Sequence, residues 1–180
     1  MQKKQNFLFL DIDGVLNCTN TNTFYDIGTP DSYGIDEQLW SNLQKFLNEF
    51  PNLKVVIHSG WTKHKDNPNY EWNLNHPELG IKIKTKLPDV IQRLGNRYFD
   101  CVPYIKGKPK KTRIEKWLTD NNLSLSNCQC LVIDDDRSQY TDLKSLEKYP
   151  NITVYFTDKT VGLDNQCLND ILEIGKSIFS

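Results

Sequence analysis

The stretch that decides the fold is FLFLDIDGVLN at residues 7–17. The apolar run that opens it is too short for a helix, and we interpret it as a strand buried on both faces. Successive side chains of a strand point to opposite sides, so Asp11 and Asp13 share one side and Ile12 takes the other. Two carboxylates in one place repel each other unless a cation lies between them or one is protonated. The stretch therefore indicates a site for a hard metal ion and a phosphate, and Gly14 permits the tight turn that follows.

The composition indicates a globular protein with one domain. The chain has 180 residues, 38% hydrophobic and 11% aromatic, and we take residues 1–180 as a single domain large enough for a proper core. No window approaches a membrane span and the polar start differs from a signal peptide, so we expect a cytoplasmic protein. The formal net charge of −1 provides no global field for nucleic acid or an anionic membrane. The five cysteines lack a paired zinc spacing, and we expect reduced thiols.

Two later apolar runs also end in polar residues. Residues 54–61, KVVIHSGW, indicate a strand that ends at His58 and Ser59, and residues 130–137, CLVIDDDR, indicate a strand that ends in adjacent aspartates. Adjacent aspartates repel one another without a cation, and Mg²⁺ takes hard oxygen ligands. Without chemistry, residues 7–17 would be a strand followed by an ordinary acidic turn, and Ser59 would only cap the next helix. We interpret His58 as a polar residue packed near the strand end rather than as a ligand.

A basic segment precedes a predicted helix. Residues 104–118 read YIKGKPKKTRIEKWL, and Ile114, Trp117 and Leu118 have helical spacing. The lysines therefore cluster at and before the N-terminus of this helix, where cations oppose the helix dipole and a bound anion would compensate them. A solvated charged surface is the alternative.

Apolar spacing elsewhere in the chain predicts an α/β fold. Helical patterns occupy residues 36–50, with Asp36 as N-cap, residues 88–98 and residues 166–175, and a further strand is expected at residues 151–156. Residues 18–34 and 61–80 are expected to form loops. Strands that alternate with helices predict a Rossmann-like three-layer α/β/α sandwich with a mainly parallel sheet. Ligands bind beyond the carboxyl ends of such strands, where the three polar ends would converge.

These motifs, in this order, resemble those of the haloacid dehalogenase-like (HAD) phosphatase superfamily: Asp-x-Asp after a first strand, Ser after a second, Lys ahead of a helix, and an acidic pair after a further strand. The resemblance implies that Asp11 is the nucleophile and Asp13 the acid and base. It implies that Ser59 holds the transferred phosphoryl oxygen. It implies that a lysine, Lys110 with Lys108 as its rival, neutralises the nucleophile and the phosphate.

The resemblance also implies a metal site and a reaction. Asp11, the Asp13 carbonyl and the acidic pair Asp134 and Asp135 would hold Mg²⁺, and a shift of the pair by one residue to Asp135 and Asp136 stays open. The reaction implied is phosphoryl transfer through an aspartyl-phosphate. The segments between the motifs leave no room for a large cap domain, and an open site suits a bulky substrate.

More narrowly, the stretch at residues 9–17, the Ser-Gly-Trp at residues 59–61, the Trp-Leu helix and the Ile-Asp-Asp-Asp at residues 133–136 look like the phosphatase-like domains of RNA-repair proteins. The Asp-Asp-Arg at residues 135–137 also resembles the phosphatase half of polynucleotide kinase-phosphatases. We therefore predict a Mg²⁺-dependent phosphomonoester hydrolase, with RNA or DNA ends as candidate substrates. The alternatives are a phospho-acceptor module like response-regulator receivers, whose motifs come in a different order, and a non-catalytic module that binds nucleic acid or protein.

Overall fold

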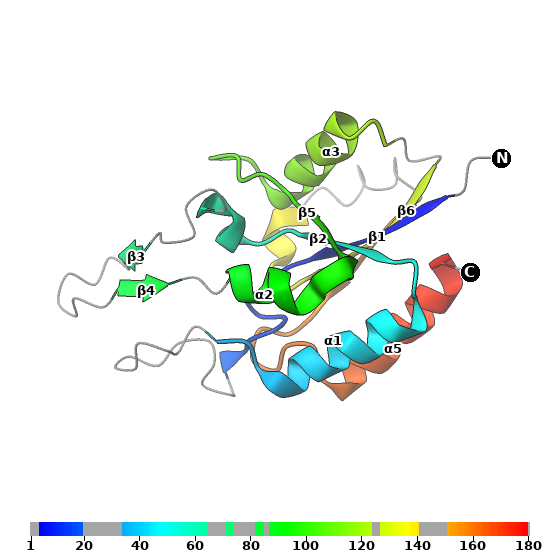
Figure 1. Cartoon of the computed structure of the whole chain (residues 1–180), viewed down its shortest axis with the longest axis horizontal. Helices are drawn as coiled ribbons and strands as arrows, with labels where there is room; N and C mark the ends of the chain where they lie inside the picture. The colour runs from blue at the N-terminus through cyan, green and yellow to red at the C-terminus, as the bar shows by residue number, and fades with distance from the viewer. Residues whose placement is uncertain are drawn as a thin grey trace.

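A parallel sheet lies at the centre of the molecule (Figure 1). The computed structural model describes residues 4–19, 34–64, 71–73, 82–84, 87–123, 127–140 and 151–179. The strand order is β5-β2-β1-β6-β7, and all neighbouring strands run parallel. The strands are β1 (Gln5–Leu10), β2 (Lys54–Ile57), β5 (Tyr98–Cys101), β6 (Cys128–Asp134) and β7 (Ile152–Phe156). The predicted parallel sheet is confirmed.

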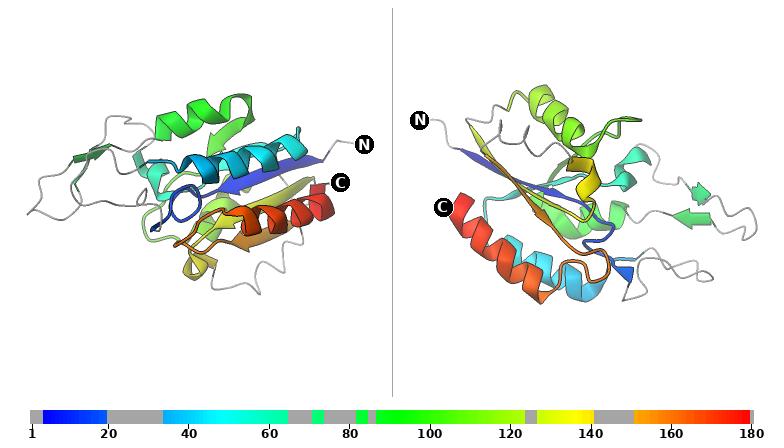
Figure 2. Two further views of the ribbon diagram at one scale, coloured as in Figure 1. Left: turned by 90° about the horizontal axis from the view of Figure 1, so that it is seen from below. Right: turned by 180° about the vertical axis from the view of Figure 1, so that it is seen from behind.

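Helices cover both faces of this sheet and form the outer two layers (Figure 2). One face carries α1 (Glu37–Glu49), α2 (Leu87–Leu94) and α5 (Asn165–Phe179), and the other carries α3 (Lys110–Asp120). The chain runs from β1 outward through β2 to β5 and then returns to the other side of β1 as β6. The order in which strands are added therefore reverses between β1 and β6. Open α/β sheets bind their ligands at such a switch point, beyond the carboxyl ends of the strands.

The alternating side chains of β1 join the two layers. Phe7 and Phe9 pack in the core beneath α3, and Leu8 and Leu10 pack in the core beneath α1, α2 and α5. All four side chains are fully buried. The interpretation of the opening apolar run as a strand buried on both faces is confirmed.

Helix α1 begins where its capping residue predicts. The Asp36 carboxylate accepts hydrogen bonds from the backbone N–H groups of Gln38 at 2.8 Å and Leu39 at 3.0 Å. Two N–H groups of the first helical turn are thereby satisfied. The predicted N-cap is confirmed.

The structure differs from the sequence prediction in two regions, residues 88–98 and residues 61–80. The helical pattern assigned to residues 88–98 ends early, because α2 stops at Leu94 and Gly95 has a φ of +54°, after which Tyr98 begins β5. Within residues 61–80, predicted as a loop, the 3₁₀ helix η2 (Gly60–His64) opens the segment, and β3 (Glu71–Asn73) pairs antiparallel with β4 (Lys82–Lys84). Most of the loop predicted at residues 18–34 lies outside the described residues.

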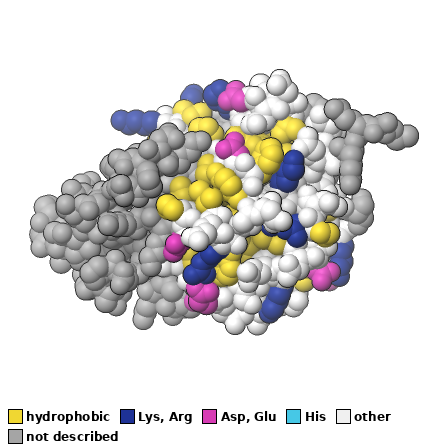
Figure 3. Space-filling view, in the orientation of Figure 1, with side chains coloured by type: hydrophobic (Ala, Val, Ile, Leu, Met, Phe, Trp, Pro, Cys, Tyr) yellow, Lys and Arg dark blue, Asp and Glu magenta, His cyan; other side chains and the backbone are white. Residues whose placement is uncertain are grey.

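The surface and the cysteines agree with the composition. On the face shown in Figure 3, basic and acidic side chains are interspersed rather than gathered by sign. All five cysteines are free and buried. Among the helices that the structure describes, none combines the length and the apolar character needed to cross a lipid bilayer.

Candidate functional site

Strand alternation brings two aspartates to the same side of the sheet. Asp11 comes two residues after Phe9, and Asp134 comes two residues after Val132, so both inherit the side that faces α3. The backbone N–H of Asp11 donates to the carbonyl of Ile133 at 3.0 Å, which places the two strand ends next to each other. Helix α3 begins at Lys110 above this point.

Lys110 joins the two aspartates. Its Nζ contacts the Asp11 carboxylate and lies 3.0 and 2.8 Å from the two carboxylate oxygens of Asp134. The exposed fractions of Lys110, Asp11 and Asp134 are 8%, 2% and 0%. Burial lowers the pKa of Lys110, but the charges of Asp11 and Asp134 outweigh it and raise the pKa above its usual value, so the ammonium stays charged. Lys108 is exposed ahead of the helix, and the geometry therefore favours Lys110 as the lysine of the site.

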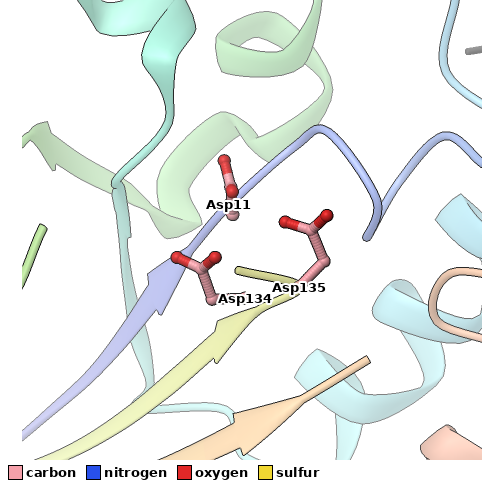
Figure 4. A group of neighbouring side chains, drawn as sticks. All are labelled: Asp11, Asp134 and Asp135. Atoms are coloured by element: carbon pink, nitrogen blue, oxygen red, sulfur yellow. The ribbon is translucent and has the colours of Figure 1, made fainter. Parts of the chain in front are cut away.

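Three carboxylates lie close enough to share a cation. Asp11, Asp134 and Asp135 each offer an oxygen within 4.8 Å of the others, and they project from the ends of β1 and β6 (Figure 4). Burial, and then repulsion by Asp11, raises the pKa of Asp134 to about 7. A set of hard carboxylate oxygens with excess negative charge fits Mg²⁺.

Asp136, the alternative member of the acidic pair, lines the cavity but lies outside the cluster of three carboxylates. Its Oδ1 accepts hydrogen bonds from the backbone N–H of Ser138 at 3.0 Å and from the Ser138 hydroxyl at 2.5 Å. These bonds hold Asp136 in its own turn, so the geometry favours Asp134 and Asp135 as the pair.

Gly14 allows Asp135 to approach the turn after β1. A Cβ at this position would lie 2.5 Å from the Asp135 carboxyl carbon, and the φ of +71° is one that L side chains rarely adopt. The Gly14 carbonyl in turn accepts a hydrogen bond from the Thr157 hydroxyl at 2.8 Å. Glycine is therefore required here by contact as well as by backbone conformation.

Asp13 lies in the same turn, on the cavity side. Its carboxyl oxygens accept hydrogen bonds from the Asn17 amide at 3.1 Å and from the Trp61 indole N–H at 2.9 Å. Burial, followed by the charge of Asp11, raises the pKa of Asp13 to about 6. Ile12, between the two aspartates, is fully buried in the opposite core, as the period of two predicts.

A cavity of about 800 Å³ opens over these groups. Asp11, Asp13 and Lys110 lie along it, and Arg137 and Lys159 add basic side chains. Cavities of this size accommodate drug-sized molecules, so the space holds far more than one phosphate group.

Comparisons with known proteins show the family of the chain and a similar fold. The sequence matches, over residues 7–167, the family described as the HAD domain in Swiss Army Knife RNA repair proteins. The chain belongs to this family. The HAD domain of effector protein Lem4 from Legionella pneumophila has a similar structure, with a TM-score of 0.51 over 99% of this chain and 97% of that one. The two sequences are 12% identical, so this likeness concerns the fold alone. No curated protein matches the sequence.

Ser59 in this HAD domain makes the contact that a capping residue would make. Its hydroxyl accepts a hydrogen bond from the backbone N–H of Trp61 at 3.3 Å, and Ser59 is buried. The neighbouring Gly60 lines the cavity. The role of Ser59 in holding a phosphoryl oxygen stays a prediction.

Asp134 of the HAD site also contacts a row of buried polar side chains that the sequence analysis did not predict. Tyr140 donates its hydroxyl hydrogen to Asp134 at 2.9 Å, and His58 Nδ1 lies 3.4 Å from the Tyr140 oxygen. Burial, helped by the charges of Lys110 and Arg113, lowers the pKa of His58 well below its usual value, so the imidazole is neutral. Tyr140 carries no motif that marks it, because only the fold brings it beneath the site.

Proposed function

We propose that this HAD domain is a Mg²⁺-dependent phosphomonoester hydrolase that works through an aspartyl-phosphate. The observation that carries the proposal is the buried Asp11 carboxylate, held by Lys110 and flanked by Asp134 and Asp135. Membership in a HAD family, with its motifs in the expected order, supports the same assignment.

The chemistry assigned to the chain's own residues is a double displacement. Asp11 attacks phosphorus and forms an acyl phosphate as the bond from phosphorus to the leaving oxygen breaks. Asp13 gives its proton to that oxygen and later takes a proton from the water that attacks the phosphorus of the acyl phosphate, which releases phosphate and restores Asp11. Lys110 stabilises negative charge at the nucleophile and on the phosphoryl oxygens.

Asp11, Asp134 and Asp135 would hold the metal ion. Mg²⁺ bound there would offset the negative charge of the site, so that an anionic nucleophile can meet an anionic phosphate. The mutual proximity of these three carboxylates supports this assignment.

We propose phosphorylated RNA or DNA ends as the substrate class. A cavity of about 800 Å³ has space for a nucleotide attached to the phosphate. Arg137 and Lys159 on its wall suit further anionic groups, and the Arg137 guanidinium lies over the Phe156 ring, 4.5 Å from the ring centroid. The family's description as domains of RNA repair proteins supports the same class.

The test measures phosphate release with Mg²⁺ and with EDTA. The substrates are p-nitrophenyl phosphate and oligonucleotides phosphorylated at the 3′ or the 5′ end. We expect metal-dependent release, a preference for one oligonucleotide, and a loss of at least about 10³-fold in Asp11→Asn, whose circular dichroism should match that of the wild type.

Each outcome decides a different part of the proposal. Undiminished activity in Asp11→Asn contradicts the aspartyl-phosphate mechanism. Release from p-nitrophenyl phosphate alone keeps the hydrolase and rejects the nucleic-acid substrate. A stable phosphoprotein formed from acetyl phosphate, without phosphate release, would instead favour the phospho-acceptor module.

A further inference from the structure

Both oxygens of the Asp13 carboxyl group receive a hydrogen bond from a buried donor. The Asn17 amide donates to Oδ1 at 3.1 Å, and the Trp61 indole N–H donates to Oδ2 at 2.9 Å. We propose that Trp61 and Asn17 are positioning residues that fix the orientation of this carboxyl group toward the leaving oxygen of the substrate. The inference rests on the proposed function, in which Asp13 protonates that oxygen.

The direction of both hydrogen bonds is determined by chemistry. An indole nitrogen only donates, so Trp61 can approach Asp13 only as a donor. The Asn17 carbonyl oxygen accepts the backbone N–H of Gly14 at 3.0 Å, which leaves its amide nitrogen facing Asp13. The carboxyl group is therefore the acceptor in both contacts.

The two donors are themselves held firmly. Asn17 is fully buried, and Trp61, which is 4% exposed, packs in the core beneath α1, α2 and α5. Asp13 by contrast is only partly buried and lines the cavity. Two buried side chains thus each donate to one oxygen of a cavity-facing carboxyl group.

Such restraint matters because the last torsion of an aspartate is broad. Rotation about the bond to the carboxyl group meets no sharp staggered minima, so an unrestrained Asp13 would sample many orientations. A general acid has to reach its partner oxygen within roughly 2.6–3.2 Å. Each oxygen uses one lone pair for its donor, so a protonated Asp13 can still donate its own hydrogen to an oxygen in the cavity.

The test compares two substrates that differ in the proton they require. Nitrophenolate leaves p-nitrophenyl phosphate with little need of a proton, whereas benzyl phosphate releases an alkoxide that needs one. The measured quantity is kcat/KM, which covers the steps through departure of the leaving group and not the later hydrolysis. Trp61→Phe keeps an aromatic side chain, although a smaller one, and removes the indole N–H; we expect it to lower kcat/KM for benzyl phosphate about tenfold more than for p-nitrophenyl phosphate.

A matched control removes an indole N–H elsewhere. Trp117 is buried in the other core and donates its indole N–H to Asp100 at 2.7 Å, away from the cavity. Trp117→Phe should change kcat/KM for the two substrates by the same factor. Asn17→Ala, which removes the donor to the other oxygen, should shift the ratio in the same direction as Trp61→Phe.

The outcomes separate the inference from the proposed function. If the wild type turns over both substrates and Trp61→Phe and Asn17→Ala reduce both equally, the positioning role is overturned while the hydrolase stands. If the folded wild type with Mg²⁺ releases phosphate neither from these two substrates nor from the phosphorylated oligonucleotides, the hydrolase fails and the positioning role fails with it. A shifted ratio in the two site variants, absent from Trp117→Phe, supports the inference.

Discussion

The interior of the sheet and its carboxyl edge are equally buried but opposite in chemistry. Phe9 in β1 and Val132 in β6 are fully buried apolar residues that pack beneath α3. Two positions further along each strand, Asp11 and Asp134 face the same side, and their exposed fractions are 2% and 0%. The interior stabilises the fold by removing apolar surface from water, whereas the edge places charges out of water at a cost that only mutual pairing offsets. The comparison teaches that the edge is arranged for chemistry and the interior for stability.

The largest effect should come from removing the Lys110 ammonium group at the carboxyl edge of the sheet. Lys110→Met leaves Asp11 and Asp134 buried without their partner, so we expect the free energy of unfolding to fall by about 3–5 kcal/mol. Loss of the charge that stabilises the transferred phosphoryl group should also lower kcat by roughly 10²–10³-fold. Urea denaturation in EDTA and phosphate-release kinetics with Mg²⁺ measure the two effects.

A double variant checks the cause of that instability. Lys110→Met combined with Asp134→Asn removes one of the unpaired charges, so it should unfold at a higher urea concentration than Lys110→Met alone, while activity stays low. Equal midpoints for the single and the double variant would contradict the explanation by unpaired buried charge.

The next effect concerns the interior and should be confined to stability. Phe9 packs edge-to-face on Trp117 with ring centroids 5.4 Å apart, and Phe9→Ala leaves a cavity there. We expect a loss of about 3–5 kcal/mol in the free energy of unfolding, measured by urea denaturation. Turnover per folded molecule should be unchanged at a temperature where the variant remains folded, and a large drop in kcat would show that the two regions are coupled.

The smallest effect should come from Asp36, which caps the N-terminus of α1 and does not line the cavity. Asp36 accepts two N–H groups at the start of α1, so Asp36→Ala should lower the free energy of unfolding by about 1 kcal/mol. Thermal melting should show a slightly lower midpoint of unfolding. Turnover assays should show an unchanged kcat/KM. A kinetic defect would place Asp36 with the residues of the site.

Local sequence patterns predicted the main secondary structure around the site. The apolar run before Asp11 predicts the central strand, the period of two predicts that Ile12 faces the opposite core, and Asp36 predicts the start of α1. These features depend on neighbours along the chain, because strand alternation and helix capping act over a few residues. The order of the motifs was likewise enough to recognise the HAD family.

Other features could not be predicted because nothing local determines them. The edge strand β5 and the pair of β3 and β4 have only three or four residues each, too few for a periodic pattern to stand out. Tyr140 belongs to no motif, Trp61 belongs to the Ser-Gly-Trp motif without a role that the motif assigns, and only the fold places them against Asp134 and Asp13.

The sequence by itself thus determined the family, the central parallel sheet and the opposite sides taken by Asp11 and Ile12 after β1. The tertiary structure favours Lys110 over Lys108, and Asp134 with Asp135 over Asp135 with Asp136, as the residues of the site. The physical reason is distance along the chain: Lys110 meets Asp11 from 99 positions away, so the choice depends on where α3 crosses the ends of β1 and β6. Residue spacing within one segment determines the side to which each side chain points. Packing between segments determines which side chains meet.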